Sequence, residues 1–158
     1  MMHTPEEINA AVTATVKTAL KNAGMADTML AKDVYEEIPR PSAKVIFGKT
    51  KISRYSGSTW QRDCRIVVAW NAPNVYTFKI DCLRAQQVIE EYLLKNGIRM
   101  EDGTVLSVDE IEGEIIEAAV ILAFSVSEIG QIEGFVSPDE EDAELMEILQ
   151  TTYEQEDY

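Results

Sequence analysis

The sequence has few of the groups that enzymes commonly use for acid–base, nucleophilic or metal chemistry. It contains one histidine, His3, and two cysteines, Cys64 and Cys82. His3 precedes the first predicted helix, so we expect it in a flexible stub that cannot hold a catalytic ring in a fixed geometry. The cysteines form no C-x-x-C pair and show no ligand spacing with His3. We therefore expect two reduced core thiols, no metal and no cofactor.

The chain also lacks a long apolar run. No stretch approaches the roughly 20 apolar residues that span a bilayer, and residues 1–7 lack the basic and apolar regions of a signal peptide. We therefore expect no membrane contact, and retention in the cytosol after synthesis. The 158 residues contain no internal repeat and no low-complexity linker, which fits one domain with one core.

No complete phosphate-binding or calcium-binding motif is present. Gly48-Lys49-Thr50 matches the end of a phosphate-binding loop, but Ala43 replaces the first glycine and a strand follows, so we interpret Gly48 as a hairpin turn. Residues 139–142 are all acidic but lack the alternating ligands and central glycine of a calcium loop. We predict that the protein is not an enzyme. A small hydrolase with a carboxylate pair stays open, because only distances in space define such a pair.

Basic residues are absent after Arg99. Residues 1–100 carry 14 basic and 10 acidic groups, whereas residues 101–158 carry 18 acidic groups and no basic one. The most basic stretch is residues 40–65, where Asp63 is the single acid. Two interpretations remain open: the halves neutralise each other within one subunit, or the basic flank of one subunit meets the acidic flank of the next in a ring. The candidate subunit or partner contacts are Lys51, Arg54, Arg62, Arg65, Glu140, Glu141 and Glu144.

Nucleic-acid binding is the other function that a basic stretch can indicate. Tyr55 and Trp60 lie near these basic residues, as aromatic groups do in single-strand binding surfaces. However, the net charge of −14 would repel a phosphate backbone at long range. We expect no sequence-specific nucleic-acid binding, and we expect Trp60 and Trp70 in the core.

Three helices are predicted from capping signals and apolar spacing. The first begins after the Thr4 cap, runs from Pro5 to about Asn22, and is ended by Gly24. Its apolar stripe is Ile8, Val12, Val16, Ala19 and Leu20. The second runs over residues 75–95 and is ended by Asn96-Gly97, and its apolar side is Phe78, Cys82, Ala85, Ile89, Tyr92 and Leu93. The third runs from Pro138 to about Thr152 and has a narrow apolar edge of Leu145, Ile148 and Leu149.

The predicted strands follow from residues that alternate between apolar and polar. Residues 43–47 and 51–55 form a pair about Gly48, and Val34-Tyr35 forms a short strand. A long strand follows, with Trp60, Cys64, Ile66, Val68 and Trp70 on one face. Arg62 is the exception on that face, and we expect its guanidinium to reach water near the strand end. Residues 98–100 and 104–106 form a hairpin about Asp102-Gly103.

The last predicted strand pair turns at Glu112-Gly113 and joins residues 108–111 to residues 115–129. Its core-facing residues are Ile116, Ala118, Val120, Leu122, Phe124 and Val126. Together the elements predict an α+β fold, with a mainly antiparallel sheet of four to six strands packed by an N-terminal helix and a central helix, and with an acidic C-terminal helix. We assign residues 1–129 to the α+β domain and residues 130–158 to the acidic helical extension.

This order of elements resembles the tail terminator family of long-tailed bacteriophages and phage-derived tail particles. The residues that carry the resemblance are Glu7-Ile8-Asn9-Ala10-Ala11-Val12, the segment from Val34 to Pro41 that leads into a strand, the arginine-rich strand that ends at Trp70, and the single helix before the final strands. They cover about residues 4–129. The match is one of pattern and order, and the acidic extension from about Gly130 departs from the shortest members of the family.

The resemblance implies a structural virion protein without catalytic residues. Such a protein forms a hexameric ring that caps the tail tube, ends its polymerisation and joins it to the neck. The implied partners are further copies of the chain, the tube protein, and sheath, neck or connector proteins, and the implied location is the virion tail, with the host cytoplasm during assembly. Two alternatives remain: a head-tail connector or tail completion ring protein, and an acidic stand-alone binding or nucleic-acid-mimic protein.

Overall fold

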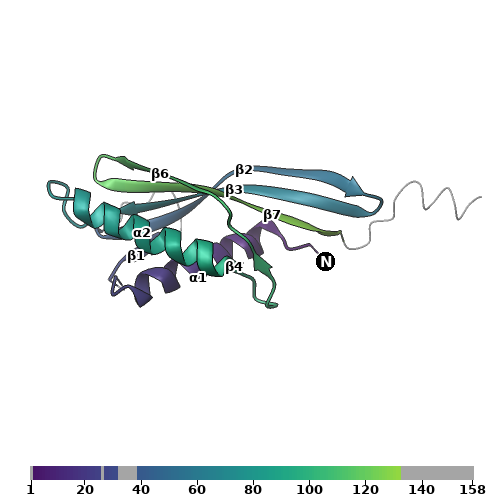
Figure 1. The fold of residues 1–158 in the computed structure, drawn as a ribbon, viewed down its shortest axis with the longest axis horizontal. Coiled ribbons are helices and arrows are strands. Elements are labelled where there is room, and N and C mark those ends of the chain that lie inside the picture. Colours follow the sequence, from purple (N-terminus) through teal and green to yellow (C-terminus); the bar gives the residue numbers. More distant parts are fainter. Residues whose placement is uncertain (1, 26, 32–38, 133–158) are drawn as a thin grey trace, which may run out of the picture.

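A computed structural model of the chain describes residues 2–25, 27–31 and 39–132. Two helices lie on one side of a five-stranded sheet (Figure 1), which confirms the α+β prediction with a mainly antiparallel sheet. In chain order, the elements are α1 (Pro5–Asn22), β1 (Met29–Ala31), β2 (Ser42–Ser56), β3 (Thr59–Asn71), α2 (Lys79–Asn96), β4 (Ile98–Arg99), β5 (Val105–Leu106), β6 (Ile111–Ile116) and β7 (Ala119–Gln131). The predicted strand at Val34-Tyr35 and the predicted C-terminal helix lie outside the described residues.

The strands of the large sheet are ordered β1-β2-β3-β7-β6. β1 pairs with the start of β2 in parallel and was not predicted, whereas the other neighbours pair antiparallel. β4 and β5 form a separate two-stranded sheet, as predicted from the turn at Asp102-Gly103. The longest pairing joins β3 to β7 over 13 residues of each strand, so these two strands form the centre of the molecule.

The core lies between the sheet and the two helices. The predicted α1 stripe is confirmed, because Ile8, Val12, Val16, Ala19 and Leu20 are all buried. The predicted alternation in the central strands is also confirmed, because Ile66, Val68 and Trp70 of β3 and Val120, Leu122 and Phe124 of β7 are buried. Trp60 is only half-buried, so its predicted place in the core is wrong. Both cysteines are free and buried, and burial raises the pKa of each thiol.

Gly48 does not form the predicted hairpin turn. It lies inside the continuous strand β2, where the register shifts between the pairs Phe47–Ile66 and Thr50–Cys64. Gly48 and Lys49 therefore both stand opposite Arg65, as in a β-bulge. A Cβ on Gly48 would lie 3.2 Å from the carbonyl oxygen of Arg65, so this glycine permits a close approach of two strands.

Gly113 is not a turn residue either, because β6 continues through it to Ile116. The chain turns instead at Glu117, which has a φ of 55°. A Cβ on Gly113 would lie 2.5 Å from Nε2 of Gln86 in α2, so the glycine makes room for a helix side chain. Because the turn comes later than predicted, Ile116 is 48% exposed and does not face the core.

Helix α2 begins at Lys79 and not at residue 75 as predicted. The side-chain oxygen of Asn74 accepts a hydrogen bond from the backbone N–H of Tyr76 at 2.8 Å. This local turn competes with helix formation, since it uses a backbone donor in a non-helical conformation. Tyr76 is consequently left 90% exposed in the connection.

Candidate interaction surfaces

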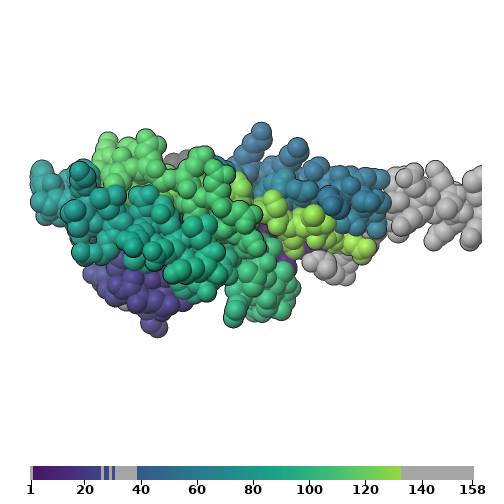
Figure 2. Space-filling model, viewed as in Figure 1, coloured from purple at the N-terminus to yellow at the C-terminus, as the bar shows by residue number. Residues whose placement is uncertain are grey.

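The far ends of three strands extend past both helices. We define this distal arm as residues 50–56 of β2, 59–64 of β3 and 126–131 of β7, and Figure 2 shows it standing clear of the helices. Three large apolar side chains of the arm are exposed: Ile52 by 44%, Tyr55 by 61% and Ile129 by 52%. Residues 2–3 contact the arm at Glu128 and Gln131. The three apolar side chains nevertheless stay exposed, which is typical of a surface that another chain covers.

The structure divides the predicted basic contact residues between the two faces of the sheet. Arg54 pairs with Trp60, and Arg62 pairs with Ile52. These side chains lie on the sheet face that also carries the buried Cys64. Lys51 and Arg65 alternate with them and lie on the opposite face. The predicted acidic contacts Glu140, Glu141 and Glu144 lie outside the described residues.

Contacts within the subunit already use part of the basic charge. The Nη2 atom of Arg65 lies 3.2 Å from Oε2 of Glu112 in β6, and the pair is exposed. The guanidinium of Arg54 lies 5.3 Å from the ring centroid of Trp60. Arg62 is half-buried, and its Nε atom is buried without a hydrogen-bond partner among the described residues. At Arg65, therefore, the basic charge is paired within the subunit, with the carboxylate of Glu112.

Lys51 stands opposite Asp63, which is the one acid of the basic stretch. The hydroxyl of Ser127 donates to Oδ1 of Asp63 at 2.6 Å, and the amide of Gln61 donates at 3.0 Å. These two hydrogen bonds, assisted by the charge of Lys51, lower the pKa of Asp63. Asp63 is therefore an ionised group held in place by neighbours on both sides.

His3 does not lie in a flexible stub, which corrects the prediction. It is 8% exposed, and its ring connects two elements that are far apart in the sequence. Its Nδ1 lies 2.6 Å from Oε1 of Glu128 in β7, and its Nε2 lies 2.7 Å from Oδ2 of Asp102 in the β4–β5 turn. The backbone N–H of His3 also donates to both carboxylate oxygens of Glu128.

The electrostatics of this cluster favour a charged imidazolium. Burial alone lowers the pKa of His3, but hydrogen bonds to Asp102 and Glu128 and the charges of both carboxylates outweigh it and raise the pKa above 6.5. Hydrogen bonds from Thr104, together with the one from His3, lower the pKa of Asp102 to about 2. Each ring nitrogen lies within hydrogen-bond distance of a carboxylate, so both nitrogens hold the ring in place. The arrangement ties the N-terminal segment to the sheet.

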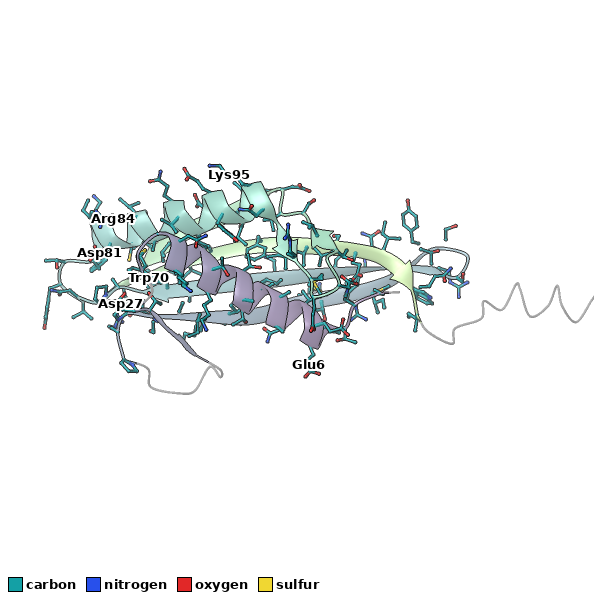
Figure 3. The ribbon with its side chains drawn as sticks, turned by 90° about the horizontal axis from the view of Figure 1, so that it is seen from below. Glu6, Asp27, Trp70, Asp81, Arg84 and Lys95 are labelled. Carbon is teal, nitrogen blue, oxygen red and sulfur yellow. The ribbon has the colours of Figure 1, made fainter. Side chains whose placement is uncertain are left out.

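A groove of about 750 Å³ lies beside the cluster of His3, Glu128 and Asp102, between the start of α1 and the β4–β5 hairpin. Ala10 and Ala14 of α1 line it, and Figure 3, seen from the helix side, shows Glu6 at this end of α1. Apart from His3 and Arg99, the charged groups of the rim are the carboxylates of Glu6, Glu7, Glu101 and Asp102. In the part of the chain that the structure describes, no group of three or more His, Cys, Asp and Glu side chains could hold a metal ion.

The two edges of the large sheet carry opposite charge. β1 pairs only with Ser42–Lys44, so the rest of β2 is an edge in the described structure. β2 contains three lysines and Arg54 but no acid. The other edge is β6, which contains Glu112 and Glu114 but no basic residue, and further acids flank it at Asp109, Glu110 and Glu117.

Neither a scan against protein-family models nor a search of curated proteins finds a match for this sequence. Within the described ranges, no helix has the length and apolar character needed to cross a membrane.

Glu128 is the site residue that sequence reasoning missed. The sequence contained a sign of this role, because Glu128 follows the buried Val126 by two residues and therefore falls on the core-facing side of the strand.

Proposed function

We propose that this protein is a structural subunit that associates head to tail into a ring and acts as a tail terminator. The observation that carries the proposal is the pair of oppositely charged sheet edges, basic along β2 and acidic along β6. Two different surfaces that complement each other produce a heterologous contact, and such contacts close into a ring when the rotation between subunits allows it.

Backbone pairing supports the same arrangement. From Val45 to Ser53, β2 pairs with β3 on one side and with no described strand on its other side. An edge of this length favours addition of a strand from another chain. Pairing of β2 with the β6 edge of the next subunit would continue the sheet and bring Lys49 and Lys51 towards Glu112 and Glu114. Opposite charges at such positions favour one partner edge and one direction of assembly.

The resemblance of residues 4–129 to tail terminators supplies the specific role. It implies six subunits that close on the end of a tail tube, stop its growth and offer a surface to neck proteins. The His3 cluster uses its ring nitrogens for a structural tie, which supports a role in contact without chemistry. The exposed Ile52, Tyr55 and Ile129 of the distal arm supply apolar area for the tube protein or for a neighbouring subunit.

A charge-swap experiment tests head-to-tail association. We expect the wild-type chain to form rings in native mass spectrometry at low salt, and we expect Lys49→Glu with Lys51→Glu to be monomeric because both edges are then acidic. Glu110→Lys with Glu114→Lys should be monomeric for the converse reason, and both avoid the Arg65–Glu112 pair. A mixture of the two variants should restore rings with alternating subunits, since every contact is again between opposite charges. Lys17→Glu with Lys21→Glu on α1 is the control and should form rings.

Electron microscopy tests the biological role. Tails assembled without this protein should have tubes of uncontrolled length, and addition of the purified protein should restore a uniform length. Tubes of normal length that fail to join heads would instead favour a connector or tail completion ring. Turnover of a substrate by the metal-stripped chain would overturn the structural role.

A further inference from the structure

No described helix covers one face of the large sheet, although Ser42 and Ala69 at one end of that face are buried. Both helices lie on the opposite face, as Figure 1 shows. The uncovered face has an apolar centre of half-buried side chains: Ile46, Val67, Ile121 and Ala123. Basic side chains border it on the side of β2 and β3: Lys44, Lys51 and Arg65. The face therefore offers an apolar strip with a basic margin.

The sequence after this sheet has the complementary character. Residues 133–158 contain ten acidic groups and no basic one. The predicted helix over residues 138–152 has its acids concentrated in residues 139–144 and its apolar edge at Leu145, Ile148 and Leu149. This segment follows directly after β7, whose last residue, Gln131, pairs with Thr59 at the tip of the distal arm.

We propose that residues 138–152 dock along the uncovered face of their own sheet. The acids of residues 139–144 lie over Lys51 and Arg65, and the apolar edge lies over Ala123 and Ile121. Docking buries the apolar strip that the two helices leave uncovered, and it pairs carboxylates with the basic margin. It requires no ring, because every contact lies within a single chain.

The distances along the chain match this placement. Five extended residues, 133–137, reach about 17 Å from Ile132. If the segment turns straight back, residues 139–144 of a helix then lie about 20–28 Å from Ile132. Ser127 and Ser125, which pair with Asp63 and Arg65, lie about 16–23 Å from Ile132 along β7. Continuing the same helix places Leu145 to Leu149 about 29–35 Å from Ile132, while Ala123 and Ile121 lie about 30–36 Å away along β7.

The acids already on this face determine where the segment lies across the sheet. Glu112 and Glu114 of β6 stand beside Ala123 and Ile121 and make that margin acidic, so the segment lies on the side of β7 that faces β3 and β2. Arg65 already pairs with Glu112 at 3.2 Å, so Lys51 is the principal basic partner of residues 139–144. Asp63 also faces the segment, but hydrogen bonds from Ser127 and Gln61 satisfy its carboxylate. The occupant is the chain's own segment and not that of another copy, because a short tether gives a local concentration of about millimolar.

Zero-length carbodiimide crosslinking of the full-length chain tests the proposal, because the reagent joins a lysine to a carboxylate only when the two are in contact. We expect crosslinks from residues 139–144 to Lys51, and none to Lys17 or Lys21 of α1, which lies on the helix side of the sheet. At about 1 M salt, where the Debye length falls to about 3 Å, the yield should decrease severalfold.

Two full-length variants complete the test of the apolar contact. Leu145→Ser with Leu149→Ser should lower the crosslink yield severalfold while leaving the melting temperature within about 2 °C, because the core between the sheet and the two helices does not contain these side chains. Gln150→Ser is the matched control, because residue 150 falls outside the apolar edge of the predicted helix. It should leave the yield unchanged.

An isotope mixture shows whether the contact lies within one chain. Mixing ¹⁵N-labelled and unlabelled chains should give crosslinks within one isotope only. Crosslinks that join the two isotopes, or that go mainly to Lys17 and Lys21, would overturn the proposal, whether or not rings form.

Discussion

Nδ1 of His3 lies 2.6 Å from Oε1 of Glu128, although the two residues are 125 positions apart in the chain. The Glu128 side chain is 8% exposed and accepts two further hydrogen bonds from the backbone N–H of His3. A carboxylate that is this buried needs a partner, because desolvation of an unpaired charge is costly. The contact therefore determines where the chain enters α1 relative to the end of β7.

Replacement of His3 should destabilise the fold measurably. We expect His3→Ala to lower the free energy of unfolding by about 2–3 kcal/mol, because Glu128 and Asp102 lose a shared partner and Glu128 stays buried. Urea unfolding monitored by tryptophan fluorescence measures the change. Thr18→Ala on the exposed side of α1 is the control and should change the free energy by less than about 0.5 kcal/mol. A loss equally small for His3→Ala would contradict the structural role of the tie.

The contribution of His3 should depend on pH in a defined direction. The folded state raises its pKa above 6.5, so the fold binds the proton more tightly than the unfolded chain does. The stabilisation is therefore fully present below pH 6.5 and is lost as the pH rises through the folded pKa. We expect the stability difference between the wild type and His3→Gln to shrink over that range. A difference that grows with pH would show that the neutral ring is the stabilising form.

Gly113 should tolerate alanine only when Gln86 is shortened. A Cβ at this position would lie 2.5 Å from Nε2 of Gln86, so Gly113→Ala should lower the free energy of unfolding by about 1–2 kcal/mol. Gln86→Ala removes the obstructing amide, and the double variant should recover part of that loss. Thermal unfolding of the four proteins in a double-mutant cycle measures the coupling. Additive effects of the two substitutions would show that the helix and β6 do not constrain each other here.

The carboxyl of Asp63 should titrate at higher pH when Ser127 is replaced. The Ser127 hydroxyl donates the hydrogen bond that contributes most to the lowered pKa of Asp63. In Ser127→Ala, we expect the pKa of Asp63 to rise towards its ordinary value, as measured by NMR titration of the side-chain carboxyl. Ser125→Ala, one residue pair along the same face, is the matched control. An unchanged Asp63 titration in Ser127→Ala would mean that Gln61 and Lys51 hold the charge without the hydroxyl.

Local signals in the sequence were sufficient wherever one segment specifies its own structure. The side chain of Thr4 accepts a hydrogen bond from the backbone N–H of Glu7 at 3.2 Å, so the start of α1 follows from residues that are neighbours in the chain. Helix α2 ends at Asn96, as Asn96-Gly97 predicted, and β4 and β5 pair about Asp102-Gly103. The alternation in β3 and β7 correctly identified the core face, because a period of two is a property of the strand itself.

Tertiary structure decided the features that depend on residues far apart in the sequence. A glycine between apolar runs can form a turn or permit a close approach, and only the neighbours Arg65 and Gln86 show that Gly48 and Gly113 permit a close approach. His3 had an ordinary local interpretation and Glu128 had none, and their ion pair exists only because the sheet brings the end of β7 to the N-terminal segment. The sequence by itself determined the helices, the central strands and the uneven distribution of charge. The sheet order then placed the basic and acidic strands at opposite edges, because strand order depends on long-range packing that no local pattern encodes.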